Sequence, residues 1–396
     1  MAESFDFIVV GKGMMGAAAA RYLALTGARV ALVGPDEPAD RTTHDGVFGS
    51  HYDNGRITRT IDMDRDWALL ARRSIDRYAQ IEADSGMPFY VEAGCLIAAP
   101  APGDPYDYLE QVMAARDTLK VDAPLLSQAE MKTRFPWFEF PKGFGGVFEA
   151  NGAGHINPRA LVAAQARIFA QNGGVVIARE VSAVCECAEY VEVVTVDGTV
   201  LQAGRVLVAA GGFSIAKPLL PQPLDLVVKA RTVLFAEVGE GQIADFAAMP
   251  SLIGSSSAQA ESYYLLPPIR YPDGRFYLKI GGDPSDIVLD HEVDIRSWFR
   301  SGDNPAAAGH LLAVLRTLMP GFDPKSVHAA PCVTTFTRHG YPYIGFMDGT
   351  RIAVLTGGNG AAAKSSDEIG RLGAALVLNG ALDAPEYGTD FSICYR

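Results

Sequence analysis

Residues 5–16 read FDFIVVGKGMMG and place a buried-strand pattern directly before a glycine-rich turn. The apolar run 7–10 predicts the strand, and the alanine-rich residues 17–26 predict the helix that follows. In this context Gly11 permits a tight turn, Gly13 lets the backbone approach a diphosphate, and Gly16 lets helix and strand pack closely. The helix N-terminus adds unpaired N–H groups and a partial positive charge. The stretch predicts dinucleotide binding; a glycine-rich strand–helix turn without a ligand is the alternative.

The second strand, residues 29–33, lacks the acid that usually follows it. Such an acid binds the ribose hydroxyls of a dinucleotide, but the expected position is Gly34, which has no side chain. Asp36 and Glu37 lie just beyond. We therefore expect the ribose contact either at Asp36 or at another group.

Composition restricts the class of protein. The chain has 396 residues, enough for one or two domains, with 48% apolar and 20% charged residues and a net charge of −12. This charge, without a basic run, argues against nucleic acid and anionic membranes as partners. We see no signal peptide and no apolar run near the ~18 residues of a spanning helix.

The five cysteines are odd in number and irregularly spaced. They suggest neither a disulfide framework nor a zinc site, and no metal site is expected. A reducing cytoplasm is the natural compartment for such a chain.

The pattern along the chain predicts two interleaved domains. A helix is predicted over 65–85, a capping box at Ser127–Glu130, a helix capped by Asn157, and a hairpin turning at Asp197-Gly198. A β-rich stretch and a helix over 306–319 follow, and strand 352–356 with helix 362–379 returns to the dinucleotide pattern. The predicted nucleotide-binding domain comprises 1–85, 152–225 and 328–396, and the substrate domain comprises 86–151 and 226–327.

Three segments carry a family resemblance: the first motif, RVLVAAGGFS at 205–214 and GGNGAAAKSS at 357–366. Together they resemble the D-amino-acid-oxidase-type flavoproteins, most of all monomeric sarcosine oxidase and the related N-methyl and cyclic imino acid oxidases. The resemblance implies an α/β fold, with a Rossmann-like FAD-binding part of the glutathione-reductase type interleaved with a β-rich substrate domain. The FAD contacts that it implies are Gly11, Gly13, Met14, Met15, Gly16, Asp36, Ser50, Arg56, Val181, Gly211, Cys332, Gly358, Asn359, Gly360 and Lys364.

The segment GSHYDNGRITR at 49–59 resembles the part of sarcosine oxidase that holds two arginines. By position Arg56 would lie near the flavin, and Arg59 would bind the substrate carboxylate together with Lys364. The family has a histidine where this chain has Tyr52. Read from the residues alone, two arginines three apart in a polar loop could instead pair with nearby acids.

Lys279, in the apolar run LKIG, matches the family lysine that lies near flavin N5 and promotes the reaction with O₂. A fixed cation in a dry site stabilises the anion that forms when O₂ takes an electron. A solvent-facing lysine on an edge strand is the alternative. Asp283 stands where the family has a histidine.

Cys332 lies at the family position that is bonded to the flavin 8α-methyl group, so the resemblance implies covalent FAD. A lone cysteine in an apolar stretch is more often a small buried side chain. Thr334 replaces a tyrosine that shapes the family pocket, which indicates a roomier or altered pocket.

The sequence thus predicts an FAD-dependent amine oxidase that dehydrogenates a secondary or cyclic amino acid to an imine and reduces O₂ to H₂O₂. Arg59, Lys364, Lys279 and Asp283 are the predicted catalytic residues, and the partners are a small amino-acid-like carboxylate and O₂. Substrate choice is assigned to residues 255–261 and to Tyr263 and Tyr264. The alternatives are a flavin dehydrogenase with a quinone or protein acceptor, an NAD-dependent dehydrogenase, and a non-catalytic flavin-binding protein.

Overall fold

The first of two large sheets has a parallel centre. The computed structural model describes residues 3–258 and 261–396, so residues 259–260 of the predicted substrate loop lie outside it. The parallel strands follow the order β20–β12–β1–β2–β9, with the antiparallel strands β10, β11 and β19 alongside. Their bounds are β1 Glu3–Val10, β2 Val30–Val33, β9 Val175–Ile177, β10 Val181–Glu186, β11 Val191–Thr195, β12 Val200–Val208, β19 Tyr343–Phe346 and β20 Ile352–Thr356.

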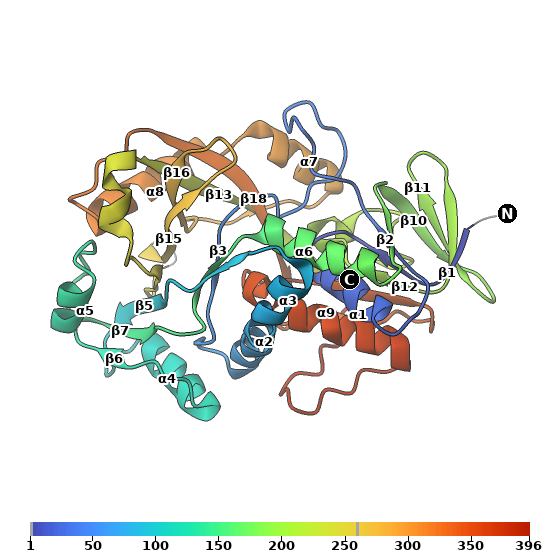
Figure 1. The fold of residues 1–396 in the computed structure, drawn as a ribbon, viewed down its shortest axis with the longest axis horizontal. Coiled ribbons are helices and arrows are strands. Elements are labelled where there is room, and N and C mark those ends of the chain that lie inside the picture. Colours follow the sequence, from blue (N-terminus) through green and yellow to red (C-terminus); the bar gives the residue numbers. More distant parts are fainter. Residues whose placement is uncertain (1–2, 259–260) are drawn as a thin grey trace.

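Both faces of this sheet are buried, as the continuous apolar runs predict. Val9 and Leu32 pack in the cluster that includes the helices on one face, whereas Ile8, Val10 and Val33 pack in a cluster on the other. Helix α1 (Met14–Ala24) packs against α6 (Pro158–Gln171) and α9 (Ala362–Asn379), and α9 also packs against α2 (Arg65–Ile75). Helix α1 thus packs against both α6 and α9, and it begins just after the carboxyl end of β1 (Figure 1).

The second sheet is mostly antiparallel and lies beside the first (Figure 1). Its strands run in the order β17–β13–β16–β15–β14–β5–β7–β6, and β18 pairs with β13. Helix α8 (Pro305–Leu318) buries Leu311, Leu315 and Leu318 against it. The strand bounds are β5 Cys95–Pro100, β6 Leu125–Leu126, β7 Phe144–Glu149, β13 Leu226–Val238, β14 Ser251–Gly254, β15 Tyr263–Arg270, β16 Phe276–Gly281, β17 Ile287–Val288 and β18 Val327–Thr337.

A small third sheet joins β3 (Arg56–Thr58), β8 (Gly154–Ile156) and β4 (Tyr90–Val91). It fixes the arginine-bearing segment between the two large sheets. The remaining helices are α3 Tyr78–Ser85, α4 Tyr108–Leu119, α5 Gln128–Arg134 and α7 Glu292–Ser301, with short 3₁₀ helices at Gly211–Ile215 and Glu240–Phe246.

Most local predictions are confirmed. The α/β class is confirmed, Ser127 and Glu130 form the capping box of α5, and the Asn157 side chain caps α6 with Pro158 in its first turn. The single helix predicted over 65–85 is wrong, because the chain forms α2 and α3 with a break at Asp76 and Arg77. At the break Arg77 forms ion pairs with Asp367 and Glu368 of α9. The helical periodicity of residues 65–85 cannot predict such a tertiary contact.

The strands of the first sheet all fall within 1–85, 152–225 and 328–396. The long strand β18 also lies almost entirely within 328–396, but it pairs with β13 and so belongs to the second sheet. The division into two discontinuous domains remains a prediction.

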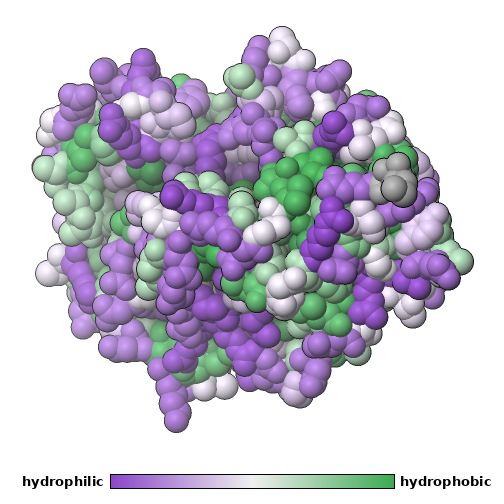
Figure 2. Space-filling view, turned by 45° about the vertical axis from the view of Figure 1, so that its right-hand side comes forward, coloured by the Kyte–Doolittle hydropathy of each residue, from purple (hydrophilic) through white to green (hydrophobic). Residues whose placement is uncertain are grey.

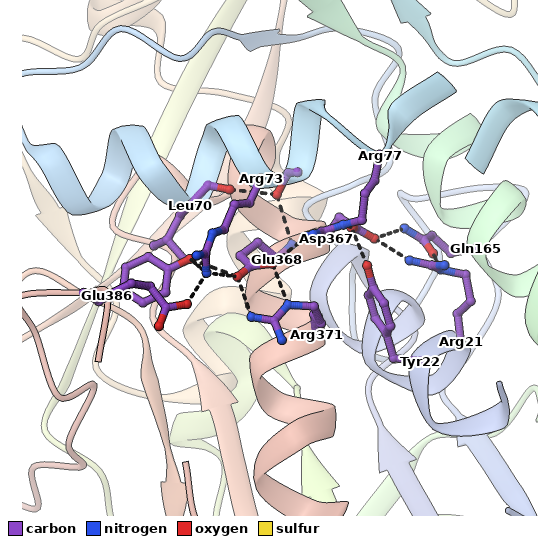
Figure 3. A network of polar contacts seen from close by, with 12 residues as sticks. Arg21, Tyr22, Leu70, Arg73, Arg77, Gln165, Asp367, Glu368, Arg371 and Glu386 are labelled. Atoms are coloured by element: carbon purple, nitrogen blue, oxygen red, sulfur yellow. Dashed lines mark hydrogen bonds and ion pairs between the residues drawn. The ribbon is translucent and has the colours of Figure 1, made fainter. Parts of the chain in front are cut away.

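A buried polar network joins the helices next to the first sheet (Figure 3). Asp367 of α9 contacts Arg21 at 2.9 Å and Arg77 at 2.6 Å, while Glu368 contacts Arg77 at 2.6 Å and Arg371 at 2.7 Å. Burial tends to raise the pKa of Glu368, but Arg371 and Arg77 outweigh it and lower this pKa to about 2. These pairs fix the angle between α9 and its neighbours.

The surface in Figure 2 mixes hydrophilic residues with smaller apolar patches. Among the helices in the described part of the chain, none has the length and apolarity needed to cross a membrane.

Candidate active site

A cavity of about 730 Å³ extends from the first glycine-rich turn to the turn before α9. Its walls include the segment after β2, the strand β18 and the arginine-bearing segment of β3. The predicted cofactor residues that line it are Gly11, Gly13, Met14, Met15, Ser50, Arg56, Val181, Gly211, Cys332, Gly358, Gly360 and Lys364. These residues come from six separate segments of the sequence. Three predicted contacts, Gly16, Asp36 and Asn359, are not among the lining residues.

The first turn has the shape that a diphosphate requires. Gly11 has a φ of +112°, and a Cβ there would lie 2.3 Å from the Ala209 carbonyl oxygen. A Cβ on Gly16 would lie 1.9 Å from the Gly11 oxygen, so Gly16 serves helix–strand contact. At Gly13 the nearest atom to such a Cβ is His51 Nδ1 at 3.9 Å, which leaves room for a ligand. The N-terminus of α1 has no acid in its first turn, which favours an anion there.

The structure explains why Gly34 replaces an acid. A Cβ at Gly34 would lie 2.8 Å from the Lys12 backbone nitrogen, so no side chain fits. Asp36 is largely exposed and forms an ion pair with Lys12. The Asn359 side chain accepts a hydrogen bond from the Thr337 N–H at 3.0 Å and so joins the last turn to β18. A ribose contact at Asp36 remains a prediction.

The predicted carboxylate-binding cations lie together at the cavity wall. Arg59 follows β3, and Lys364 lies in the first turn of α9. Arg59 Nη2 lies 3.2 Å, and Lys364 Nζ 3.1 Å, from Oδ2 of Asp62. Both cations line the cavity, whereas Asp62 does not. The sequence proposed both cations. Its alternative, pairing of the two arginines with nearby acids, also occurs, because Arg59 pairs with Asp62 and Arg56 pairs with Asp53.

Burial dominates the electrostatics of this group. It lowers the pKa of Lys364 to about 8, although Asp62 opposes the shift. Burial also works against charge on Asp62, but Lys364 and Arg59 outweigh it and lower the Asp62 pKa. Lys364 donates a further hydrogen bond to the Trp67 carbonyl at 3.1 Å, and Arg59 Nε has no partner among the described residues. Donor capacity for a second carboxylate therefore remains.

Lys279 is fully buried in β16 and does not face solvent, so the edge-strand alternative is wrong. Its Nζ forms an ion pair with Asp53 and donates to the Gly55 carbonyl at 2.8 Å. Asp53 also pairs with Arg56 and accepts from Tyr271 Oη at 2.8 Å. Burial, then the charge of Arg56, lowers the pKa of Lys279 well below its usual value, whereas Cys332 acts in the opposite direction.

Cys332 lies on β18 at the cavity wall. Arg56 Nη2 is 3.5 Å from its Sγ, and Trp298 Nε1 donates to its carbonyl at 2.8 Å. The thiol thus lies beside the Arg56 guanidinium at the cavity wall. The tryptophan contact comes from α7, and nothing in the local sequence around Cys332 indicates it.

Two of the positions that depart from the family, Asp283 and Thr334, line the cavity, as does the third, Tyr52. Asp283 accepts a hydrogen bond from the Thr232 N–H at 3.0 Å, and burial raises the pKa of its carboxyl. The buried Thr334 Oγ1 has no hydrogen-bond partner in the part of the chain that the structure describes. Both departures are therefore placed where they can alter the pocket.

Residues 6–376 match the DAO family, described as FAD dependent oxidoreductase. The chain belongs to this family. Monomeric sarcosine oxidase from Bacillus sp. (strain B-0618) is 26% identical over 96% of this chain and 94% of that protein. N-methyl-L-tryptophan oxidase from Yersinia pestis (strain Pestoides F) is 26% identical over 55% of this chain and 56% of that protein. The predicted resemblance and the class of enzyme, an FAD-dependent oxidoreductase, are confirmed.

Solved structures show the same fold at lower identity. NikD, an unusual amino acid oxidase essential for nikkomycin biosynthesis, has a TM-score of 0.79 at 20% identity, covering 99% of this chain and 98% of that one. Iminodiacetate oxidase from Chelativorans sp. BNC1 has a TM-score of 0.74 at 18% identity, covering 98% and 99%. The predicted Rossmann-like part with a β-rich second part is confirmed.

The cavity fits FAD, the cofactor of the family. The open approach at Gly13 and the acid-free N-terminus of α1 suit its diphosphate. At the other end, Gly358, Gly360 and Ala361 of the turn before α9 line the cavity together with Lys364. The family match and the shape of the cavity agree on the cofactor.

Proposed function

We propose that this FAD-dependent oxidoreductase is an oxidase that dehydrogenates a secondary or cyclic amino acid to its imine. The observation that carries this proposal is the placement of Arg59 and Lys364, two buried cations from distant segments, at the wall of one cavity. The names of the relatives, sarcosine oxidase and N-methyl-L-tryptophan oxidase, support a substrate with an alkylated amine and a carboxylate.

The chain contributes mainly positioning. Arg59 and Lys364 bind the substrate carboxylate and thereby fix the orientation of the carbon–nitrogen bond in the cavity. FAD, when bound, would accept the hydride from the substrate carbon together with its two electrons, and O₂ would take these two electrons and two protons to give H₂O₂. The amine nitrogen must be neutral to form the carbon–nitrogen double bond, and water then hydrolyses the imine.

Lys279 is the proposed electrostatic group for the reaction with O₂. It is a buried cation next to Arg56, and a fixed positive charge in a dry site stabilises a developing oxygen anion. Its ion pair with Asp53 reduces that charge. A flavin dehydrogenase with a quinone or protein acceptor is therefore the second candidate, because Lys279 is paired with Asp53 and is not among the residues that line the cavity.

Two finer features belong to the proposal. Cys332 bonds the flavin covalently, which its position beside Arg56 supports. Asp283 and the small Thr334 favour a larger or cyclic amino acid over sarcosine, with Asp283 facing a cationic or polar part of the substrate. For Asp283→Asn we expect a changed pH profile or a changed order of substrates; if neither changes, Asp283 has no part in recognition.

The test is anaerobic reduction of the bound flavin by a panel of N-methyl amino acids, proline, pipecolate and their analogues. The proposal expects bleaching by at least one secondary amino acid, and one H₂O₂ per turnover in air. No bleaching by any member of the panel would refute the activity. Bleaching without H₂O₂, together with turnover on an artificial quinone, would instead favour the dehydrogenase.

A further inference from the structure

Asp62 occupies an unusual place for an acid in a site that binds carboxylates. Its side chain is 9% exposed and contacts Arg59 and Lys364, the two cations that our proposed function assigns to the substrate. A third contact comes from the Asp64 backbone N–H, 3.3 Å from Oδ1. The acid thus bridges two segments that are about three hundred residues apart in the chain.

Asp62 does not occupy the substrate space. Arg59 and Lys364 line the cavity, whereas Asp62 is not among its lining residues. The two residues before Asp62 are also fixed, because the buried Glu149 carboxylate accepts hydrogen bonds from the N–H groups of Thr60 at 2.9 Å and Ile61 at 3.0 Å. The loop therefore presents Asp62 to the cations in one fixed position.

We propose that Asp62 is a positioning residue of the substrate site. It contacts both Arg59 and Lys364, fixes their positions and stabilises their charged forms, so that both can bind one substrate carboxylate. The proposal rests on the proposed function. Two cations and one acid leave a single net positive charge at the wall, which matches a monocarboxylate. Without the acid the two buried cations repel each other, and the lysine is the one that can lose its proton.

This arrangement has a consequence for pH. The groups that face Lys364 are Asp62, Arg59, Glu149 and Cys95, together with the ring and carbonyl of Trp67. Since the pKa of Lys364 is about 8, carboxylate affinity should fall as the pH rises through that value. Removal of an opposite charge in direct contact lowers a pKa by about 1–3 pH units. In Asp62→Asn the fall should therefore begin at a lower pH.

The experiment measures binding, not turnover. Cyclopentanecarboxylate, a cyclic amino acid without its amine, is titrated by calorimetry into the FAD-loaded protein from about pH 5 to about pH 10, because a midpoint about 1–3 pH units below 8 lies within this range. Its amide serves as the uncharged control ligand. Four proteins are compared: the wild type, Asp62→Asn, Lys364→Met and Asp66→Asn. Asp66 is a matched control, since it is also a buried acid but binds the N–H groups of Gly388 and Thr389.

We expect the wild type and Asp66→Asn to lose carboxylate affinity with a midpoint near pH 8. In Asp62→Asn the midpoint should move down by about 1–3 pH units, and in Lys364→Met the loss should disappear. An unchanged midpoint in Asp62→Asn overturns the proposal. If that variant does not fold, a loss that persists in Lys364→Met overturns it instead, because the titrating group is then not Lys364.

The two levels of inference fail differently. If the wild type binds the carboxylate no better than its amide at pH 6, the proposed function fails. If the carboxylate is preferred but Asp62→Asn keeps the wild-type midpoint, only the role of Asp62 fails.

Discussion

Replacement of Arg59 by methionine tests the carboxylate site most directly. The guanidinium is buried, and it lies 3.2 Å from Asp62. After the change Asp62 still has Lys364 at 3.1 Å and the Asp64 N–H at 3.3 Å, so the acid is not left unpaired. We therefore expect the fold and the flavin spectrum to persist while the substrate carboxylate loses half of its binding partners.

The expected loss follows from the burial of this pair. Removal of one partner of a buried, hydrogen-bonded charge pair typically costs ~2–5 kcal/mol. With 1.4 kcal/mol for each factor of ten, carboxylate affinity should fall by about 30- to 4,000-fold. The dissociation constant of cyclopentanecarboxylate, measured by calorimetry at pH 7, gives this value, and its amide should be affected far less.

Arg65→Met is the matched control, because Arg65 also pairs with a neighbouring acid, Asp66, but is 44% exposed outside the cavity. It should bind the carboxylate like the wild type. Equal carboxylate affinities for the wild type, Arg59→Met and Lys364→Met would refute the reasoning, because a site formed by these cations cannot lose either without effect.

Three further predictions concern the flavin, oxygen and stability. If Cys332 bonds the flavin, acid-precipitated protein stays yellow and Cys332→Ser releases FAD to the supernatant; free FAD from the wild type would contradict this. Lys279→Met should retain anaerobic reduction by substrate but slow reoxidation by O₂ about 10²-fold or more, as stopped-flow absorbance can measure; an unchanged rate would exclude Lys279 as the cation. Since Glu368 has a pKa of about 2, below the usual 4.5, its stabilisation is present above pH 4.5 and is lost as the pH falls through 2. Glu368→Gln should destabilise the protein at pH 7 by ~3–5 kcal/mol and flatten this acid dependence in urea unfolding; equal stabilities would disprove the role of the network.

The predictions that succeeded rest on local chemistry. The strand and glycines of 5–16, the Ser127 capping box and the Asn157 cap each need only neighbouring residues, and all form as predicted. The prediction of one helix over 65–85 was wrong because the chain there depends on contacts with distant residues. Its break at Arg77 coincides with ion pairs to Asp367 and Glu368, almost three hundred residues away.

The sequence by itself determined the nucleotide-binding turn, the kind of fold and the identity of the cations Arg59, Lys279 and Lys364. The turn depends on short spacing that is visible in the chain, and the three cations were proposed from the family resemblance of their segments. Only the tertiary structure decided the partners of those cations, because Asp62 and Asp53 reach Lys364 and Lys279 through folding of distant segments. Buried charges must be compensated, yet the choice of the compensating acid depends on which segments the fold brings within about 3 Å.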